Sequence, residues 1–189
     1  MTKDKKKAFT LIELLMVVAI IGILAGILIP TVGAVRKQAN IAASKSQLAN
    51  YLTAMQMFKG EYGYFPLATG TGDSDEIDIA SESKAFMQAI SGRNPTTGAT
   101  VIAGGNRRGI AFHSFSESEL QYDASDKAVT HQIADRFNNI NIFIVVDTNG
   151  DGFVAPAGPN SSEGRIKTNV TAYVVDSSSD DFESYKLWD

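Results

Sequence analysis

The hydrophobic pattern near the start of the chain is an unbroken apolar run. Residues 14–29 carry no polar side chain, and Phe9, Leu11 and Ile12 lie just before them. Together they reach about the 20 residues that span ~30 Å of hydrocarbon as a helix. A buried core helix is the alternative, but such a helix keeps a polar face, which this run lacks. The pattern therefore predicts one membrane-spanning helix.

The flanks of the run indicate its orientation. Four lysines and one aspartate precede it, at positions 3–7. The positive-inside rule then places the N-terminus in the cytoplasm and everything after Pro30 across the membrane. No small-residue cleavage pattern of the Ala-x-Ala kind follows Ile29, so we expect the helix to be retained.

Beyond the run the pattern becomes amphipathic and predicts that the helix continues. Four apolar positions at offsets of 0, 7, 11 and 14 share one helical face: Ile41, Leu48, Leu52 and Met55. We expect this face to lie on a globular head. Lys59 followed by Gly60 is typical of a helix C-terminus, with a basic last turn and then glycine.

The head, residues 61–189, is expected to be small and mixed. Spaced apolar residues predict a short helix at Ser81–Ile90. Alternating ones predict strands at Ile140–Val146 and Ile166–Val175, with Ile110–Phe115 as a candidate third strand. A long helix with a small antiparallel sheet laid across its amphipathic half is an α+β fold.

Polar segments separate these elements. Thr69–Asp75 is rich in Gly, Asp and Ser and is predicted to be a loop, and the acidic run at 73–78 is interpreted as a solvated face. The stretch between Ser91 and Gly109 is also loop-like. Its paired glycines lack the Lys-Ser/Thr of a phosphate loop, so no nucleotide site is predicted.

Composition and charge exclude several classes of protein. The 189 residues include 17 basic and 21 acidic ones, and without residues 1–8 thirteen basic and twenty acidic ones remain. Because an acidic body offers no basic patch for phosphates, no nucleic-acid partner is expected. The chain has no cysteine, which excludes disulfides and Cys-type zinc sites. Its two histidines form no recognisable catalytic set, so we expect no enzyme activity.

Glu13 is out of place in the apolar segment. A carboxylate at membrane depth costs about 2.5–3.5 kcal/mol even on the gentler insertion scales. Such a charge calls for a partner. The alternative is that Glu13, only four residues beyond Phe9, reaches the headgroups at the membrane surface.

Residues 5–30, KKKAFTLIELLMVVAIIGILAGILIP, resemble the N-terminus of a type IV prepilin or type II secretion pseudopilin. The shared features are a basic leader, a small residue, Phe, Thr-Leu-Ile-Glu, an apolar helix and Pro. The resemblance implies that a membrane aspartyl peptidase cuts between Ala8 and Phe9 and methylates the new amine of Phe9. It also implies that Glu13 pairs with the terminal amine of an adjacent subunit. Ala8 stands where the family usually has Gly.

The same segment suggests how helices would assemble. An amine from another subunit would favour the ionised form of Glu13 and offset its desolvation. Gly22 and Gly26 form a G-x-x-x-G spacing that lets helices approach closely in lipid. Pro30 is predicted to kink or locally melt the helix.

The resemblance also divides the chain into four parts. They are a leader, a transmembrane and assembly helix, an amphipathic helix entering the head, and the head: residues 1–8, 9–30, 31–60 and 61–189.

An acidic loop follows the first predicted C-terminal strand. From Asp147 through Asn149 and Asp151 to Phe153, it has the D-x-N-x-D-G spacing of the first half of an EF-hand-type calcium loop. The twelfth position is Gly158 rather than Glu, which excludes a full EF-hand. A metal-free Asp-Gly hairpin turn is the alternative.

The resemblance to major pseudopilins implies calcium in loops of the C-terminal region. The segment from Asp176 to Asp181 resembles that family's Ser/Gly/Asp loop before a terminal Trp-containing strand, and Trp188 follows it. Asp180 and Asp181 are therefore further calcium candidates. A cation that binds only the folded state would stabilise a head without disulfides.

These observations favour a structural subunit of a type II secretion pseudopilus. The expected partners are further copies of the chain, the prepilin peptidase, an inner-membrane assembly platform and minor pseudopilins. The expected location is the bacterial inner membrane, with the head periplasmic, and then the filament. The alternatives are a type IV pilin for adhesion, motility or DNA uptake, and a non-polymerising single-pass anchored binding protein or enzyme.

Overall fold

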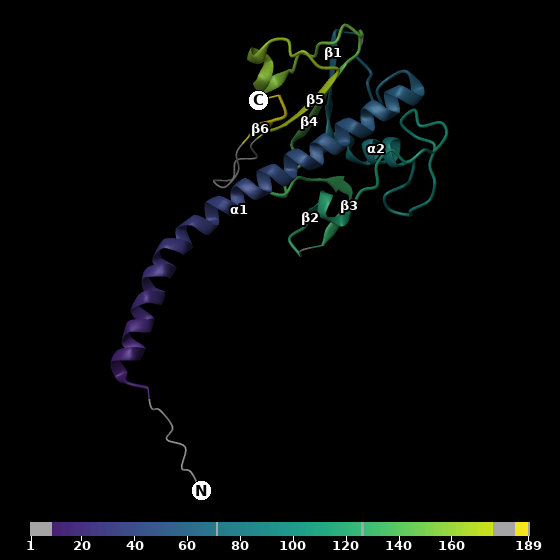
Figure 1. Cartoon of the computed structure of the whole chain (residues 1–189). Helices are drawn as coiled ribbons and strands as arrows, with labels where there is room; N and C mark the ends of the chain where they lie inside the picture. Colours follow the sequence, from purple (N-terminus) through teal and green to yellow (C-terminus); the bar gives the residue numbers. More distant parts are fainter. Residues whose placement is uncertain (1–8, 71, 126, 176–183, 189) are drawn as a thin grey trace. The chain divides into compact units, whose positions relative to one another are not determined.

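The computed structural model describes most of the chain, in four stretches: 9–70, 72–125, 127–175 and 184–188. Its architecture confirms the predicted α+β class, with a long N-terminal helix followed by small antiparallel sheets (Figure 1). The chain divides into two compact units, Met1–Ala39 and Asn40–Asp189. Helix α1, Leu11–Tyr62, runs through the boundary between them.

In the first unit the apolar run forms a helix whose described large side chains are exposed. Its large hydrophobic side chains between Leu11 and Ile29 are all exposed, from 49% at Val17 to 79% at Leu11. Within the described residues, α1 is the one helix long and apolar enough to cross a membrane, with a mean hydropathy of 2.9 in its most apolar window. The backbone stays helical through Pro30, so the local melting expected there is not found.

In the second unit α1 is amphipathic, as predicted. Leu48, Tyr51, Met55 and Phe58 are all 0–1% exposed and recur every three or four residues, which puts them on one face. Leu52 packs against the same cluster from its margin. The helix therefore supplies one wall of the core.

The helix ends one turn later than predicted. Gly63 lies in the left-handed region at φ +83°, and its N–H donates to the Lys59 carbonyl at 2.7 Å. This closes the last turn after Tyr62, while Gly60 lies inside the helix. The sequence offers two glycines three residues apart, and the later one provides the cap.

Helix α2, Ile79–Ser91, confirms the predicted short helix and begins two residues earlier. The Asp78 side chain caps it by accepting from the Ala80 N–H at 2.9 Å. Gly92 ends it at φ +63°, with its N–H donating to the Gln88 carbonyl.

The main sheet has four antiparallel strands in the order β1-β4-β5-β6. Their bounds are Ser74–Asp78, Ile142–Asp147, Val170–Val174 and Tyr185–Lys186. Strands β4 and β5 confirm the two predicted ones. β5 is shorter than predicted because Ile166 instead forms an isolated bridge with Val154.

Two assignments from the sequence are wrong. The acidic run at 73–78 is largely strand β1 and not a solvated face, because Ile77 is buried and the strand pairs with β4. Ile110–Phe115 is not a strand. It crosses the end of α2, where the Phe112 N–H donates to the Ile90 carbonyl at 2.8 Å.

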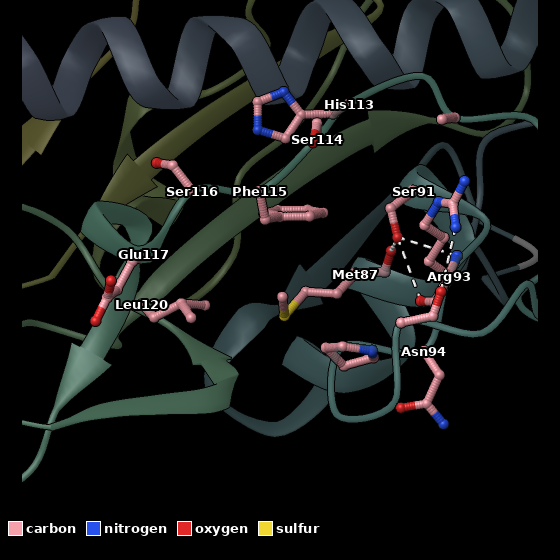
Figure 2. Close-up of a pocket in the computed structure, with 13 residues that line it drawn as sticks. Met87, Ser91, Arg93, Asn94, His113, Ser114, Phe115, Ser116, Glu117 and Leu120 are labelled. Carbon is pink, nitrogen blue, oxygen red and sulfur yellow. Dashed lines mark hydrogen bonds between the residues drawn. The ribbon is translucent and has the colours of Figure 1, made fainter.

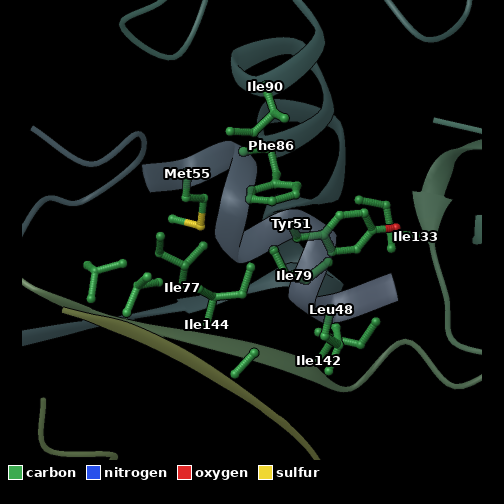
Figure 3. Close-up of a cluster of buried hydrophobic side chains, with 14 of the residues drawn as sticks. Leu48, Tyr51, Met55, Ile77, Ile79, Phe86, Ile90, Ile133, Ile142 and Ile144 are labelled. Carbon is green, nitrogen blue, oxygen red and sulfur yellow. The ribbon is translucent and has the colours of Figure 1, made fainter. Parts of the chain in front are cut away.

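The core lies between α1, α2 and one face of the sheet. Figure 3 shows Met55, Tyr51 and Leu48 from α1 facing Phe86 of α2 and Ile144 of β4. The other face carries a second cluster, built on buried Val145, Val154 and Tyr173, with Phe143, Ile166 and Trp188 packed against it. Both faces of the sheet are therefore covered.

A second, two-stranded sheet pairs β2, Leu120–Tyr122, with β3, Ala128–Ile133. Neither strand was predicted. A side chain occupies one edge of β2, since the Tyr122 N–H donates to the Asn138 Oδ1 at 2.7 Å and the Asn138 Nδ2 donates to the Tyr122 carbonyl at 2.9 Å. Asn138 has φ +60°, a conformation that asparagine tolerates well. Two short 3₁₀ helices, Glu117–Glu119 and Gly158–Glu163, complete the fold.

Candidate assembly surface and acidic loop

The start of α1 is closed by a reciprocal pair of residues. The Thr10 N–H and hydroxyl both donate to Oε2 of Glu13, at 2.9 and 2.8 Å, and the Glu13 N–H donates to the Thr10 hydroxyl at 3.3 Å. This is a capping box, in which two unpaired donors at the helix start are satisfied at once. Within a single chain, Glu13 therefore already has hydrogen-bond donors.

Sequence reasoning missed the role of Thr10, although the signal was present. Thr-Leu-Ile-Glu at 10–13 is the Ser/Thr-x-x-Glu spacing that precedes an apolar helix. The pairing predicted for Glu13 with another subunit stays a prediction, because the structure holds one chain. Phe9 is described and 82% exposed, while Ala8, on the other side of the expected cut, lies outside the described residues.

The predicted contact glycines face open space. No side chain or distant backbone of the described residues lies within 4 Å of the position that a Cβ would take at Gly22 or Gly26. Their surface is thus free for a close approach by another helix. That approach remains a prediction, as does any part of Pro30 in assembly.

The acidic loop after β4 is closed by its own hydrogen bonds. Asp147, 2% exposed, accepts from the Gly150 N–H at 2.7 Å through Oδ1 and from the Gly152 N–H at 3.0 Å through Oδ2. Asn149 Oδ1 accepts from the Asp151 N–H at 2.9 Å, and Asp151 Oδ1 accepts from Phe153 at 2.9 Å. The backbone is held in a tight turn.

Two residues from elsewhere complete this loop, and sequence reasoning named neither of them. The Asn149 Nδ2 donates to Oδ1 of Asp73, the residue just before β1, at 3.1 Å and to Oδ2 of Asp151 at 3.2 Å. The Arg165 guanidinium pairs with the same Oδ2 of Asp151. No spacing in the sequence connects positions 73, 151 and 165, because the contacts depend on the paths of two loops.

The ionisation of Asp151 reflects these neighbours. Desolvation raises the pKa of its carboxyl, but hydrogen bonds from Asn149 and the Phe153 N–H, together with the positive charge of Arg165, outweigh it and lower the pKa below its usual value. Asp151 is therefore held as the carboxylate.

These residues match the expected calcium site only in part. Carboxylate and amide oxygens are the ligands that a hard cation prefers. However, the described residues contain no group of three His, Cys, Asp or Glu side chains placed to hold a metal ion. Asp180 and Asp181 lie outside the described residues. Calcium binding thus stays a prediction.

A second polar cluster lies beside a cavity of about 300 Å³ in the head (Figure 2). Glu119 Oε2 meets the His113 Nε2 at 2.9 Å and accepts from the Tyr51 hydroxyl at 2.7 Å, and its Oε1 accepts from the Ser116 N–H and hydroxyl. Gln47 of α1 donates to the Tyr51 hydroxyl and to the carbonyl just after β3. The cluster ties α1 to the loops around it.

The arrangement is not that of a catalytic triad. Ser116 bonds Glu119 rather than His113, and no described serine hydroxyl hydrogen-bonds the His113 ring. Burial raises the pKa of Glu119, but hydrogen bonds from His113, Ser116 and Tyr51 outweigh it and lower that pKa to about 2. Glu119 therefore acts as a partly buried, charged acceptor that joins three segments.

Comparison with known proteins agrees with this architecture. Residues 3–29 match the prokaryotic N-terminal methylation motif. A 53-residue stretch is 47% identical to the type IV wide pilus major component PilA4 of Thermus thermophilus, covering 28% of this chain and 40% of that relative. No solved structure matches. The chain thus spans less than half of the curated relative, and the match says nothing about most of the head.

The methylation motif covers the start of the exposed apolar helix, and small antiparallel sheets follow that helix. Over part of its length the chain is thus similar to a type IV pilin, and its N-terminal segment carries the methylation motif.

Proposed function

We propose that this chain is a structural subunit of a helical filament, specifically of a type II secretion pseudopilus. The observation that carries the proposal is the apolar half of α1, exposed along its whole length and headed by the methylation motif. In the membrane, lipid covers this surface. After extraction from the membrane, only helices of other subunits can bury it, which makes polymerisation the natural outcome.

Processing precedes assembly in this proposal. The prepilin peptidase cuts between Ala8 and Phe9 and methylates the amine of Phe9. The lysines at positions 3–7 hold the leader in the cytoplasm and place the head in the periplasm. The inner-membrane platform and minor pseudopilins then act on the inserted protomer.

Glu13 changes partner on assembly. In the single chain its carboxylate takes donors from Thr10. In the filament the positive amine of Phe9 of an adjacent subunit replaces these neutral donors, and an ion pair is stronger where water is excluded. The exchange would fix the axial register between helices.

A surface pilus is the second candidate. The similarity to a major component of a wide pilus favours it. The pseudopilus is favoured by the absence of cysteine, because many type IV pilins close their C-terminal region with a disulfide. Structural subunits of this family are not enzymes in either case.

Calcium remains a separate proposal for the acidic loop. Asp147, Asn149 and Asp151 would provide oxygen ligands together with the Phe153 carbonyl, and Asp180 and Asp181 would approach from the C-terminal segment. Its effect would be on the stability of the head and not on a reaction.

The mature N-terminus and the filament test the main proposal together. Mass spectrometry of the protein from peptidase-proficient cells should find N-methyl-Phe9 at the new terminus. Glu13→Ala should insert as well as the wild type, because the substitution removes a carboxylate from the apolar segment. It should reduce filament incorporation at least tenfold, which corresponds to a loss of about 1.4 kcal/mol in the free energy of assembly.

Two results would contradict the proposal. An intact leader in such cells would favour the anchored, non-polymerising protein, and normal filaments from Glu13→Ala would remove the role of that carboxylate. Deletion of the gene separates the two filament types, since loss of secreted protein indicates a pseudopilus and loss of surface fibres indicates a pilus.

A further inference from the structure

We infer that Arg165 is the resident cation of the acidic loop, and that any divalent cation must compete with Arg165 for the Asp151 carboxylate. The inference concerns the head alone and does not depend on filament formation. It explains how a D-x-N-x-D-G loop is closed by protein atoms.

Every carboxylate and amide oxygen of Asp147, Asn149 and Asp151 already has a donor from the protein. Both oxygens of Asp147 accept backbone N–H groups, the Asn149 oxygen accepts another, and Asp151 Oδ1 accepts a fourth. The remaining oxygen, Asp151 Oδ2, takes the Arg165 guanidinium and the Asn149 amide. The charged partner in this network is Arg165, since the other donors are neutral.

The orientation of the Asn149 amide fits a loop in which Arg165, rather than a metal ion, supplies the positive charge. Its oxygen faces the Asp151 N–H, while its nitrogen donates to both Asp73 and Asp151. The reverse orientation would place the amide oxygen against two carboxylates and its N–H₂ group against a donor. The side of Asn149 nearest the two carboxylates therefore presents hydrogens, whereas a metal ion at that point would need oxygen.

Arg165 is itself held in place from two sides. Its guanidinium lies 4.8 Å from the centroid of the Phe153 ring, a cation–π distance, while it pairs with Asp151. The next residue, Ile166, forms the bridge with Val154 that fixes the returning loop. A planar guanidinium can stack and donate at once, which a lysine ammonium does less well.

The charge balance supports a protein cation here. Three carboxylates, of Asp73, Asp147 and Asp151, lie on or beside one turn. The Asp147 carboxylate accepts from two backbone N–H groups, and the Asp73 carboxylate accepts from a neutral amide. Removal of the guanidinium would leave Asp151 next to this negative charge, and an added cation would relieve the repulsion.

The experiment compares the full chain in detergent micelles with Arg165→Gln, in EDTA and in 10 mM calcium. Trp188 is the chain's single tryptophan and packs on the cluster that contains Val154 and Ile166, so its fluorescence reports on this side of the head during melting. Arg108→Gln is the matched control, because Arg108 forms an exposed ion pair with Glu61 and not with a residue of the acidic loop.

Three results are expected. In EDTA, Arg165→Gln should lower the Tm by about 2 °C, as should Arg108→Gln, since exposed ion pairs contribute little. Calcium should then raise the Tm of Arg165→Gln by about 3–10 °C, the range for a site with a Kd of ~10⁻⁴–10⁻³ M. Calcium should raise the Tm of the wild type and of Arg108→Gln by less than half as much.

Either of two outcomes overturns the inference. One is a calcium shift in the wild type equal to that of Arg165→Gln, which would show that Arg165 does not compete. The other is no calcium shift in Arg165→Gln, which would show that the loop does not take a cation when the guanidinium leaves.

A conservative variant guards against misfolding of Arg165→Gln. Arg165→Lys keeps the charge, and its calcium shift should stay close to that of the wild type. A calcium shift in Arg165→Lys well above that of the wild type would also refute the inference, because the resident positive charge would then not be what excludes the metal ion.

Discussion

Glu119 joins three segments through a single carboxylate with a side chain only 12% exposed. Its two oxygens bond Tyr51 of α1, His113 of the loop after α2, and Ser116 at the start of the 3₁₀ helix. Residues of this kind stabilise a head without cysteine, because one buried charge satisfies several donors that would otherwise be unpaired.

The stability of the head should therefore depend on pH through Glu119. Its pKa is lowered in the folded state from 4.5 to about 2. A lowered pKa means that the charged form stabilises the fold, so this contribution is complete above about pH 4.5 and is lost as the pH falls toward 2. Thermal melting between pH 7 and pH 2 should show the wild type losing on the order of 2–3 kcal/mol more than Glu119→Gln.

Parallel pH profiles of the two proteins would contradict this assignment. Glu117→Gln is a suitable control, because Glu117 lies in the same 3₁₀ helix and its side chain is exposed.

At the scale of the elements, the C-terminus of α2 depends on one close backbone approach. Gly92 has φ +63°, and a Cβ there would stand 2.6 Å from the carbonyl carbon and oxygen of Gly109. The chain passes so close because the Val101 N–H donates to the Gly92 carbonyl and the Phe112 N–H donates to the Ile90 carbonyl. The loop from 92 to 110 is thus folded back on the helix end.

Gly92→Ala should destabilise the head more than Gly98→Ala does. Gly98 has a similar φ of +70°, but a Cβ there would have nothing within 4 Å. Both variants should lose about 1 kcal/mol from left-handed backbone strain, and Gly92→Ala should lose a further 1–3 kcal/mol or so from the clash. Chemical denaturation would measure the difference, and equal losses would show that the approach to Gly109 is not rigid.

The elements that the sequence predicts are those with strong local patterns. The apolar run, the amphipathic stretch of α1, helix α2 and strands β4 and β5 all follow from periodicity. Strand β1 was missed because three of its five residues are acidic, and it is a strand only because β4 pairs with it. Tertiary pairing here overrides local preference.

The candidate site residues also divide into those with a local sequence signal and those without one. Phe9, Glu13 and the glycines could be named as candidates because the N-terminal motif is contiguous in sequence, and Thr10 also had a capping signal. Arg165 had none, because it meets Asp151 through the return of a loop. Contacts of this kind depend on the folded path of the chain and cannot be obtained from spacing.

At the scale of the whole molecule, the two units differ in how many of their side chains are buried. The described side chains before Asn40 include no buried one, whereas the core residues all lie after it, beginning with Ser44 and Leu48. A change of surroundings would therefore break no buried contact of the described side chains in the first unit. The head keeps its own core throughout.

Residues 40–189 should therefore fold without the preceding segment. We expect this fragment to be monomeric in size-exclusion chromatography without detergent, and its Tm to lie within about 3 °C of that of the full chain in micelles, because no buried apolar surface is removed. Aggregation or loss of cooperative melting would show that the apolar segment contributes to the head.

The two hydrogen bonds between the Asn138 side chain and the Tyr122 backbone limit how the strands of two heads can pair. The unpaired N–H and C=O groups of an open strand edge can pair with a strand of a neighbouring molecule, which leads to aggregation. At Tyr122 both the donor and the acceptor on that edge are already taken by one amide side chain. If the chain assembles as proposed, neighbouring heads would therefore not pair their strands at Tyr122, and contacts between the helices would have to order the filament.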